Sequence, residues 1–292
     1  MMQIPFQKTI SHVARVSGRG YWTGKNVSLT FLPAEPDTGI VFCRKDLAGR
    51  PTIPALASYR TDAQLRTKLV AGQASVEMVE HVLAALYGMG IDNCLVECDA
   101  PEMPGMDGSA YQIALAIHQA GRITSDRPIK FKQIEKALRI GDQQVYVEAS
   151  PSQQPGLTLV YHLDYGPESP IPSSSSSCLL SPEEFLGSIA PARTFLTQSD
   201  AMKLQASGVA RHVTHRDLVI FGDSGPIDNQ LRFPDECSRH KLLDLIGDLA
   251  LCGHRIQGMV FACRSGHNLN GQMAEQIQTL RVHNQKSLIK AA

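Results

Sequence analysis

The sequence lacks any apolar run close to the roughly eighteen residues that a membrane-spanning helix needs. Its first residues, Met1 to Lys8, also lack the long apolar core of a signal peptide. The sequence therefore predicts a protein without a transmembrane segment, and the expected compartment is the cytoplasm.

The chain also lacks net charge, because 28 basic side chains balance 28 acidic ones. This balance excludes a bulk attraction to nucleic acid or to an acidic membrane, so an anionic ligand would need a local basic site. Signals for disulfides are missing as well, since the seven cysteines are odd in number and form no C-x-x-C pair. Such cysteine usage predicts free thiols in a reducing compartment.

The first part of the 292-residue chain combines strand and helix patterns. Short alternating runs up to about residue 45 predict strands, residues 75–87 predict a helix with Ser75 as its N-cap, and residues 94–98 predict a buried strand. A second helix is expected from Tyr111. The polar segment 121–128 then predicts a linker between domains, so the expected domains are residues 1–125 and 126–292.

The second part starts again with strands, at residues 136–149 and 156–165. Residues 166–177, rich in glycine, proline and serine, predict a flexible loop. Helices are expected at residues 236–251 and at about residues 273–280. Strands followed by helices, twice along the chain, predict an α+β fold.

The most informative segment for function is the predicted helix at 236–251. His240 and Asp244 are four residues apart, so they would share one face and could bind one cation, with Asp248 one turn further along. An imidazole nitrogen and a carboxylate oxygen suit Zn²⁺, which takes about four ligands. The alternative is a capped surface helix whose His and Asp face solvent.

A third ligand must come from elsewhere, and His81 is the best candidate. Glu80 precedes it, so a carboxylate would lie near any metal that His81 binds, where a general base for water is needed. His267 follows an apolar strand pattern and a glycine, and a histidine there suits acid catalysis because its ordinary pKa is near neutrality. Taken alone, His81 and His267 also fit structural or surface histidines.

Together these segments resemble the zinc-dependent UDP-3-O-acyl-N-acetylglucosamine deacetylases of lipid A biosynthesis. The matching stretches keep the family's order through most of the chain. They are Val79-Glu80-His81, Gly90-Ile91-Asp92-Asn93, Met106-Asp107-Gly108-Ser109-Ala110, Ala192-Arg193-Thr194-Phe195, Arg239-His240-Lys241 through Asp248, Cys252-Gly253-His254 and Ser265-Gly266-His267.

The resemblance implies a function, a fold and a set of roles. It implies removal of the N-acetyl group from an acylated UDP-sugar, and two similar two-layer α/β sandwich domains packed helix to helix, with zinc in the cleft between them. We expect a monomer. The implied roles are zinc binding for His81, His240 and Asp244, general base for Glu80, general acid or oxyanion partner for His267, oriented by Asp248, oxyanion contact for Thr194, and substrate contacts for Phe195, Lys241 and Asp107.

Some stretches depart from the family pattern. Trp22-Thr23-Gly24 stands where the family has His-Thr-Gly or His-Ser-Gly, and Gln143-Gln144-Val145 lies where a lysine is expected. Four polar side chains replace small or apolar ones near the acyl passage, which predicts a weaker or altered preference for acyl-chain length: Arg66, Lys68, Arg211 and His212. Two further hypotheses follow: a divergent zinc amidase with another substrate, and a non-catalytic zinc-binding paralogue with a regulatory role. Retention of Glu80 and His267 argues against the last.

Overall fold

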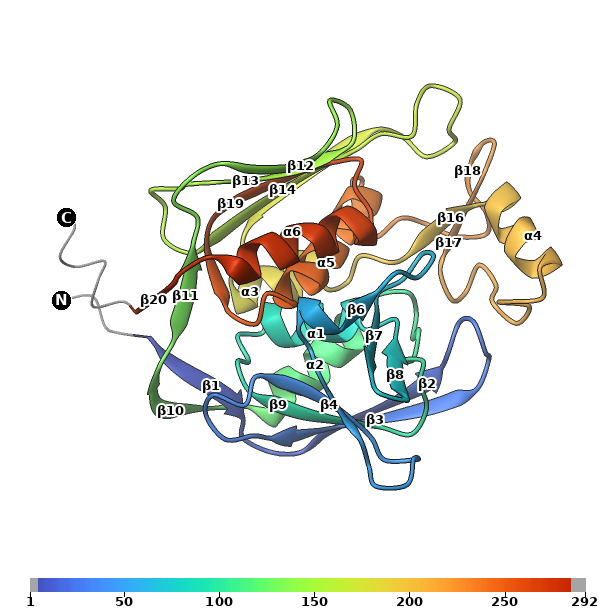
Figure 1. The fold of residues 1–292 in the computed structure, drawn as a ribbon. Helices are drawn as coiled ribbons and strands as arrows, with labels where there is room; N and C mark the ends of the chain where they lie inside the picture. The colour runs from blue at the N-terminus through green and yellow to red at the C-terminus, as the bar shows by residue number, and fades with distance from the viewer. Residues whose placement is uncertain (1–4, 285–292) are drawn as a thin grey trace.

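Two β-sheets enclose a layer of helices in the computed structural model, which describes residues 5–284 (Figure 1). One sheet comes mainly from the first part of the chain and the other from the second part. This mixed arrangement of sheets and helices confirms the predicted α+β class.

The first sheet is five-stranded, in the order β2-β3-β9-β4-β5. Its strands alternate buried and less buried side chains, so one face turns to the helices. Cys94 and Cys98 lie four residues apart on the same face of β9, and both are fully buried in this core. The prediction of a buried strand at residues 94–98 is therefore confirmed. The strands are β2 (Ala14–Arg19), β3 (Asn26–Pro33), β9 (Cys94–Cys98), β4 (Ile40–Arg44) and β5 (Thr52–Pro54).

The second sheet has seven strands within residues 5–284, and β19 is its central strand. This strand pairs antiparallel with β13 and parallel with β14 and β11. The expected flexible loop at 166–177 is wrong from Ser174 onward, because alternate residues of this segment are buried in strand β15. The strands are β11 (Lys130–Gln133), β12 (Leu138–Gly141), β13 (Tyr146–Ser150), β14 (Leu157–Leu163), β15 (Ser174–Leu179), β19 (Arg255–Cys263) and β20 (Val282–Asn284).

Helices α1 and α5 cross between the sheets and make the most extensive contact of the helix layer (Figure 1). Gly247 permits this contact, because a Cβ added there would lie 2.0 Å from the main-chain oxygen of Glu80. The helices are α1 (Glu80–Gly88), α2 (Tyr111–Ala120), α3 (Pro182–Glu184), α4 (Gln198–Ala206), α5 (Glu236–Ala250) and α6 (His267–Thr279), with a 3₁₀ turn η1 (Ala57–Tyr59) and a π-helical turn η2 (Phe185–Ile189).

Smaller sheets complete the fold. There are two three-stranded sheets among the described residues, and a two-stranded sheet joins β1 to β10. Their strands are β6 (Arg60–Thr61), β7 (Lys68–Ala71) and β8 (Ala74–Glu77), then β16 (Phe195–Thr197), β17 (Val219–Gly222) and β18 (Gly225–Pro226), and β1 (Phe6–Ile10) with β10 (Arg122–Pro128).

Some predicted element bounds are wrong. Ser75 is not an N-cap, because Ala74–Glu77 forms strand β8 and α1 begins at Glu80 after a turn in which Met78 has φ +59°. The predicted linker 121–128 is largely strand β10, held by antiparallel pairing with β1. Since β10 crosses the expected boundary at residue 125, the division into residues 1–125 and 126–292 stays a prediction.

The helices of the second part agree better with the sequence. The expected helix at 236–251 is α5, whereas the last helix begins at His267, six residues earlier than predicted. Within residues 5–284, no helix is both long and apolar enough to cross a membrane. All seven cysteines lie in this described range, and each carries a free thiol.

Candidate metal centre

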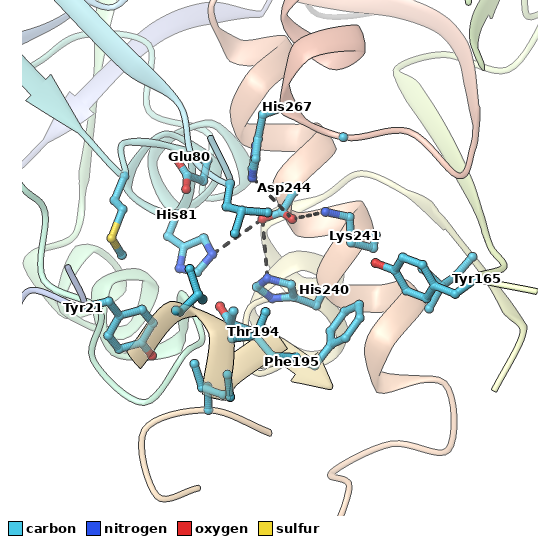
Figure 2. Close-up of a pocket in the computed structure, with 18 of the residues that line it drawn as sticks. Tyr21, Glu80, His81, Tyr165, Thr194, Phe195, His240, Lys241, Asp244 and His267 are labelled. Carbon is cyan, nitrogen blue, oxygen red and sulfur yellow. Dashed lines mark hydrogen bonds and ion pairs between the residues drawn. The ribbon is translucent and has the colours of Figure 1, made fainter. Parts of the chain in front are cut away.

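Three side chains from α1 and α5 converge at one point. His81 comes from the start of α1, while His240 and Asp244 lie one turn apart on α5. Asp244 Oδ1 lies 3.6 Å from His81 Nε2 and 3.5 Å from His240 Nε2 (Figure 2). The three donor atoms all lie within 4.8 Å of one another, and all three residues are buried. The structure therefore brings the predicted ligands together as a group that can hold a metal ion.

The state of His240 fits metal binding. Its Nδ1 lies 3.1 Å from the carbonyl oxygen of Ala192, so this nitrogen must carry the proton and donate it. Burial lowers the pKa of His240 to about 4, against the opposing effect of Asp244. The imidazole is thus neutral at pH 7, and its Nε2 lone pair faces the other two donors.

Asp244 is ionised at neutral pH. Burial alone would raise its pKa, but Lys241, together with His240 and His267, holds the pKa of this carboxyl well below its usual range. The Lys241 ammonium donates to Asp244 Oδ2 at 2.7 Å and leaves Oδ1 facing the histidines. Two imidazole nitrogens and one carboxylate oxygen are donors that suit zinc, and a metal held by three such ligands has a further position for water or substrate.

Glu80 lies beside the three donors, at the first position of α1. Its carboxylate accepts a hydrogen bond from the backbone N–H of Thr67 at 2.9 Å. Burial raises the pKa of Glu80, although the nearby His267 and His81 partly offset that effect. A carboxylate with a raised pKa is a better proton acceptor, which is the property that a general base needs.

His267 faces the same point from the first position of α6. Its Nδ1 lies 2.9 Å from Asp248 Oδ2, and its Nε2 lies 4.0 Å from Asp244 Oδ2. Burial alone would lower its pKa, but the negative charges of Asp248, Asp244 and Glu80 outweigh burial and raise the pKa to about 9. The ring is therefore an imidazolium at pH 7, and Asp248 fixes its orientation.

These side chains line a pocket of about 590 Å³. We call Glu80, His81, His240, Asp244 and His267 the polar cluster. Another part of the lining is mostly apolar, with Gln205 as an exception, and comes from α4, β16, β17 and the segment between α4 and β17. We call it the apolar wall, and it consists of Leu196, Ala201, Leu204, Val213, Leu218 and Ile220.

Thr194 and Phe195 line the same pocket and lie close to His240 (Figure 2). The Thr194 hydroxyl donates to the carbonyl oxygen of Gly108 at 2.9 Å, so contact with an oxyanion would require it to rotate. The Phe195 ring meets the His240 ring edge-on, with 5.9 Å between the ring centres. Phe195 therefore presents an apolar surface next to the predicted ligands.

Asp107 is placed differently from the other predicted residues, because it does not line this pocket. Its carboxylate accepts hydrogen bonds from Arg232 at 2.7 Å and from the Ser109 hydroxyl at 2.6 Å. The neighbouring Gly108 carbonyl bonds to both the N–H and the hydroxyl of Thr194. The direct substrate contact of Asp107 stays a prediction.

The polar side chains expected to interrupt the acyl passage are absent from the pocket lining: Arg66, Lys68, Arg211 and His212. The Arg66 guanidinium lies over the Trp22 ring at 4.2 Å and bonds to Glu77 at 3.0 Å. The His212 ring bonds to the carbonyl oxygen of Gly20. The expected interruption of this pocket by these four side chains is therefore wrong, because neighbouring residues such as Leu65, Ala210 and Val213 form the lining instead.

Sequence reasoning missed two parts of the site. It did not find the hydrogen bonds that hold Asp248, which come from the Thr67 hydroxyl and the Asn270 amide. It also missed the apolar wall. Thr67 lies in the stretch 65–69, whose departures drew attention to Arg66 and Lys68 instead, and Asn270 lies in the polar segment of His267, so their positions were noted without a role. Apolar residues at 196–220 do not differ in pattern from an ordinary core.

Comparisons with known proteins agree with this geometry. The family model described as UDP-3-O-acyl N-acetylglycosamine deacetylase matches residues 7–279. The chain is 40% identical to a protein of Citrifermentans bemidjiense over 276 residues, covering 93% of this chain and 88% of the relative. It is 37% identical to a protein of Chlamydia abortus over 273 residues, covering 93% and 96%.

A protein of Actinobacillus succinogenes is 36% identical over 270 residues, covering 91% of this chain and 88% of the relative. All three relatives carry the name UDP-3-O-acyl-N-acetylglucosamine deacetylase. The family match spans nearly the whole chain, from β1 to α6, and includes every residue of the polar cluster. On these grounds, the chain belongs to the UDP-3-O-acyl N-acetylglycosamine deacetylase family.

Proposed function

We propose that this protein is a zinc-dependent hydrolase that removes the N-acetyl group from a UDP-3-O-acyl-N-acetylglucosamine, a step of lipid A biosynthesis. The observation that carries the proposal is the position of Glu80 and His267 beside the three metal donors. A proton acceptor with a raised pKa and an imidazolium thus share one pocket with a metal site. A non-catalytic site has no need of such a pair.

His81, His240 and Asp244 would hold the zinc ion, and the ion would polarise the amide carbonyl and the attacking water. Glu80 is the group that takes the proton of the water, since its carboxylate lies in the pocket next to His81. Its raised pKa makes this transfer more favourable.

The His267 imidazolium supports the second half of the reaction. Attack on the amide places negative charge on the carbonyl oxygen, and a preorganised cation lowers the energy of that charge. His267 carries a proton at neutral pH, so it can donate to the leaving amine. We therefore assign the amine proton to His267 rather than to Glu80, and Asp248 keeps the ring in place.

The remaining lining supports an acylated sugar as substrate. Lys241 is a cation in the lining whose side chain is 13% exposed, Phe195 offers an apolar face, and the apolar wall can bury a hydrocarbon chain. Burying one methylene stabilises a complex by about 0.8 kcal/mol, so a long acyl chain in this pocket increases kcat/KM strongly. We propose that the preference for a long chain is retained.

The test is mass spectrometry of products after incubation of the zinc-loaded protein with the acylated UDP-sugar. The non-acylated UDP-sugar serves as the matched control substrate. We expect loss of one acetyl group from the acylated compound and much slower loss from the control. Absence of turnover on the acylated compound, with zinc bound, would rule out the proposed function.

A further inference from the structure

Thr67 bonds to Glu80 and to Asp248, the carboxylate that orients His267. It lies just before β7 and is 1% exposed. Its backbone N–H donates to Glu80 Oε2 at 2.9 Å, and its hydroxyl donates to Asp248 Oδ1 at 2.5 Å. Its carbonyl oxygen accepts from the N–H of Val79 at 3.4 Å, at the start of α1. One residue of the first part of the chain thus contacts α1 and reaches across to α5.

The hydroxyl matters because Asp248 is a fully buried carboxylate. Its Oδ2 accepts from the Asn270 amide at 2.9 Å and lies 2.9 Å from His267 Nδ1. Within residues 5–284, the Thr67 hydroxyl is the donor to Oδ1. A buried charge that loses one of its hydrogen bonds reorients or shifts towards the partners that remain. Those partners include the imidazole that must stay aimed at the substrate.

The backbone N–H of Thr67 likewise restrains the Glu80 carboxylate through a hydrogen bond. It occupies Oε2, while Oε1 has no hydrogen-bond donor among residues 5–284. One oxygen is thus fixed and the other is available to accept a proton. Because the same residue holds Asp248, the positions of the proton acceptor and of His267 are coupled through Thr67.

We propose that Thr67 is a positioning residue, which sets the geometry of Glu80 relative to His267 through its bonds to Glu80 and Asp248. Thr67 does not line the pocket, so it acts without touching substrate. The inference rests on the proposed function, because it concerns the same proton-transfer pair.

The main test replaces Thr67 by valine, which keeps the branched shape and removes the hydroxyl. Kinetics and zinc content of Thr67→Val are compared with those of Thr67→Ser, which keeps the hydroxyl. We expect kcat of the valine variant to fall by about 10–100-fold, the usual cost of losing a partner that orients a catalytic ligand. KM and zinc content should stay unchanged, and the serine variant should recover most of the activity.

Thr9→Val is the matched control, because it removes a hydroxyl that accepts from the N–H of Ala34 at 3.0 Å, far from the pocket. A valine variant at Thr67 no slower than this control would overturn the inference. So would a serine variant as slow as the valine variant, or a loss of zinc in proportion to the loss of kcat. Thr67→Ala also lacks the hydroxyl but has a smaller side chain than valine, so its kcat should fall as that of Thr67→Val does.

A crystallographic comparison separates this inference from the proposed function, because it needs no turnover. In Thr67→Val we expect the Asp248 carboxylate and the His267 ring to move, and in Thr67→Ser we expect both to stay in place. Unchanged positions of both groups in the valine variant would overturn the positioning role. Inactivity of the wild-type protein, by contrast, would refute the proposed function alone.

Discussion

The polar cluster and the apolar wall belong to one pocket but are built in opposite ways. Members of the polar cluster come from α1, α5 and α6, up to 187 positions apart along the chain between Glu80 and His267, and hydrogen bonds fix them. The wall comes from the single segment 196–220, and its helix α4 has no buried residue. The geometry of the polar cluster is thus set by buried contacts between distant elements, whereas the apolar wall is a local structure near the periphery (Figure 1).

The largest effect should follow from removing a metal donor from the polar cluster. We expect His81→Ala to lose the bound zinc and, with it, almost all activity, because two donors on α5 do not complete a site. Elemental analysis of purified protein measures the zinc, with His254→Ala as a control histidine outside the pocket lining. Unchanged zinc content in His81→Ala would remove His81 from the site.

The next largest effect should come from Glu80, whose replacement should lower the reaction rate without lowering the zinc content. Glu80→Ala should reduce the rate by about 10²–10⁴-fold, the usual contribution of a positioned proton-transfer group. Its zinc content should remain near that of the wild type, because Glu80 is not one of the three donors. The base assignment fails if the variant loses zinc but regains near-normal turnover when zinc is supplied again.

A smaller effect should come from the apolar wall and should depend on the substrate. Leu204→Asp places a charge in the wall, so the gain of about fourfold in kcat/KM per buried methylene should shrink for long acyl chains. Short-chain substrates should react as with the wild type. Met202→Asp is the matched control, since Met202 lies on the same helix, is 62% exposed and does not line the pocket. Equal losses at every chain length would contradict this role of the wall.

The smallest effect concerns the charge state of His267 in the metal-free protein. Its pKa of about 9 exceeds the value of about 6.5 in an unfolded chain, so its contribution to stability is complete below pH 6.5. That contribution is lost as the pH rises through about 9. Asp248→Asn removes the nearest negative charge and should lower the pKa, which NMR titration of the imidazole would detect. An unaltered pKa would show that Asp248 does not hold the proton there.

The contrast between cluster and wall also explains what the sequence could predict. His240 and Asp244 share a helix face at a spacing that any helix would impose, so the structure confirms their proximity. His81 and His267 were singled out from their local patterns and given roles by the family resemblance, and the structure places both in the pocket although the expected starts of their helices differ. Met78 and Arg264 explain those errors, because each adopts a positive φ, of +59° or +55°, in the turn that leads into a site helix. Non-glycine residues rarely take this conformation, so sequence patterns do not predict it.

Sequence patterns did not predict the apolar wall or the hydrogen bonds that hold Asp248. Arg66 was expected to face the acyl passage, but its guanidinium lies over Trp22 and bonds to Glu77. The direction of a long side chain depends on tertiary neighbours that a motif does not specify. The same holds for Thr67, whose partner Asp248 lies 181 positions away.

Gly247 has a consequence for attempts to engineer a more stable protein. Replacing a glycine inside a helix by alanine ordinarily stabilises the helix by about 1 kcal/mol, which makes α5 an attractive target. Here the added methyl group would meet the main chain of Glu80 at 2.0 Å, and a main chain cannot rotate away as a side chain can. Relief would require α1 to move away from α5, and His81 would move with it from His240 and Asp244. At this position intrinsic helix propensity and helix packing impose opposite demands, so a substitution chosen from helix propensity alone would lose stability and displace His81 from the site.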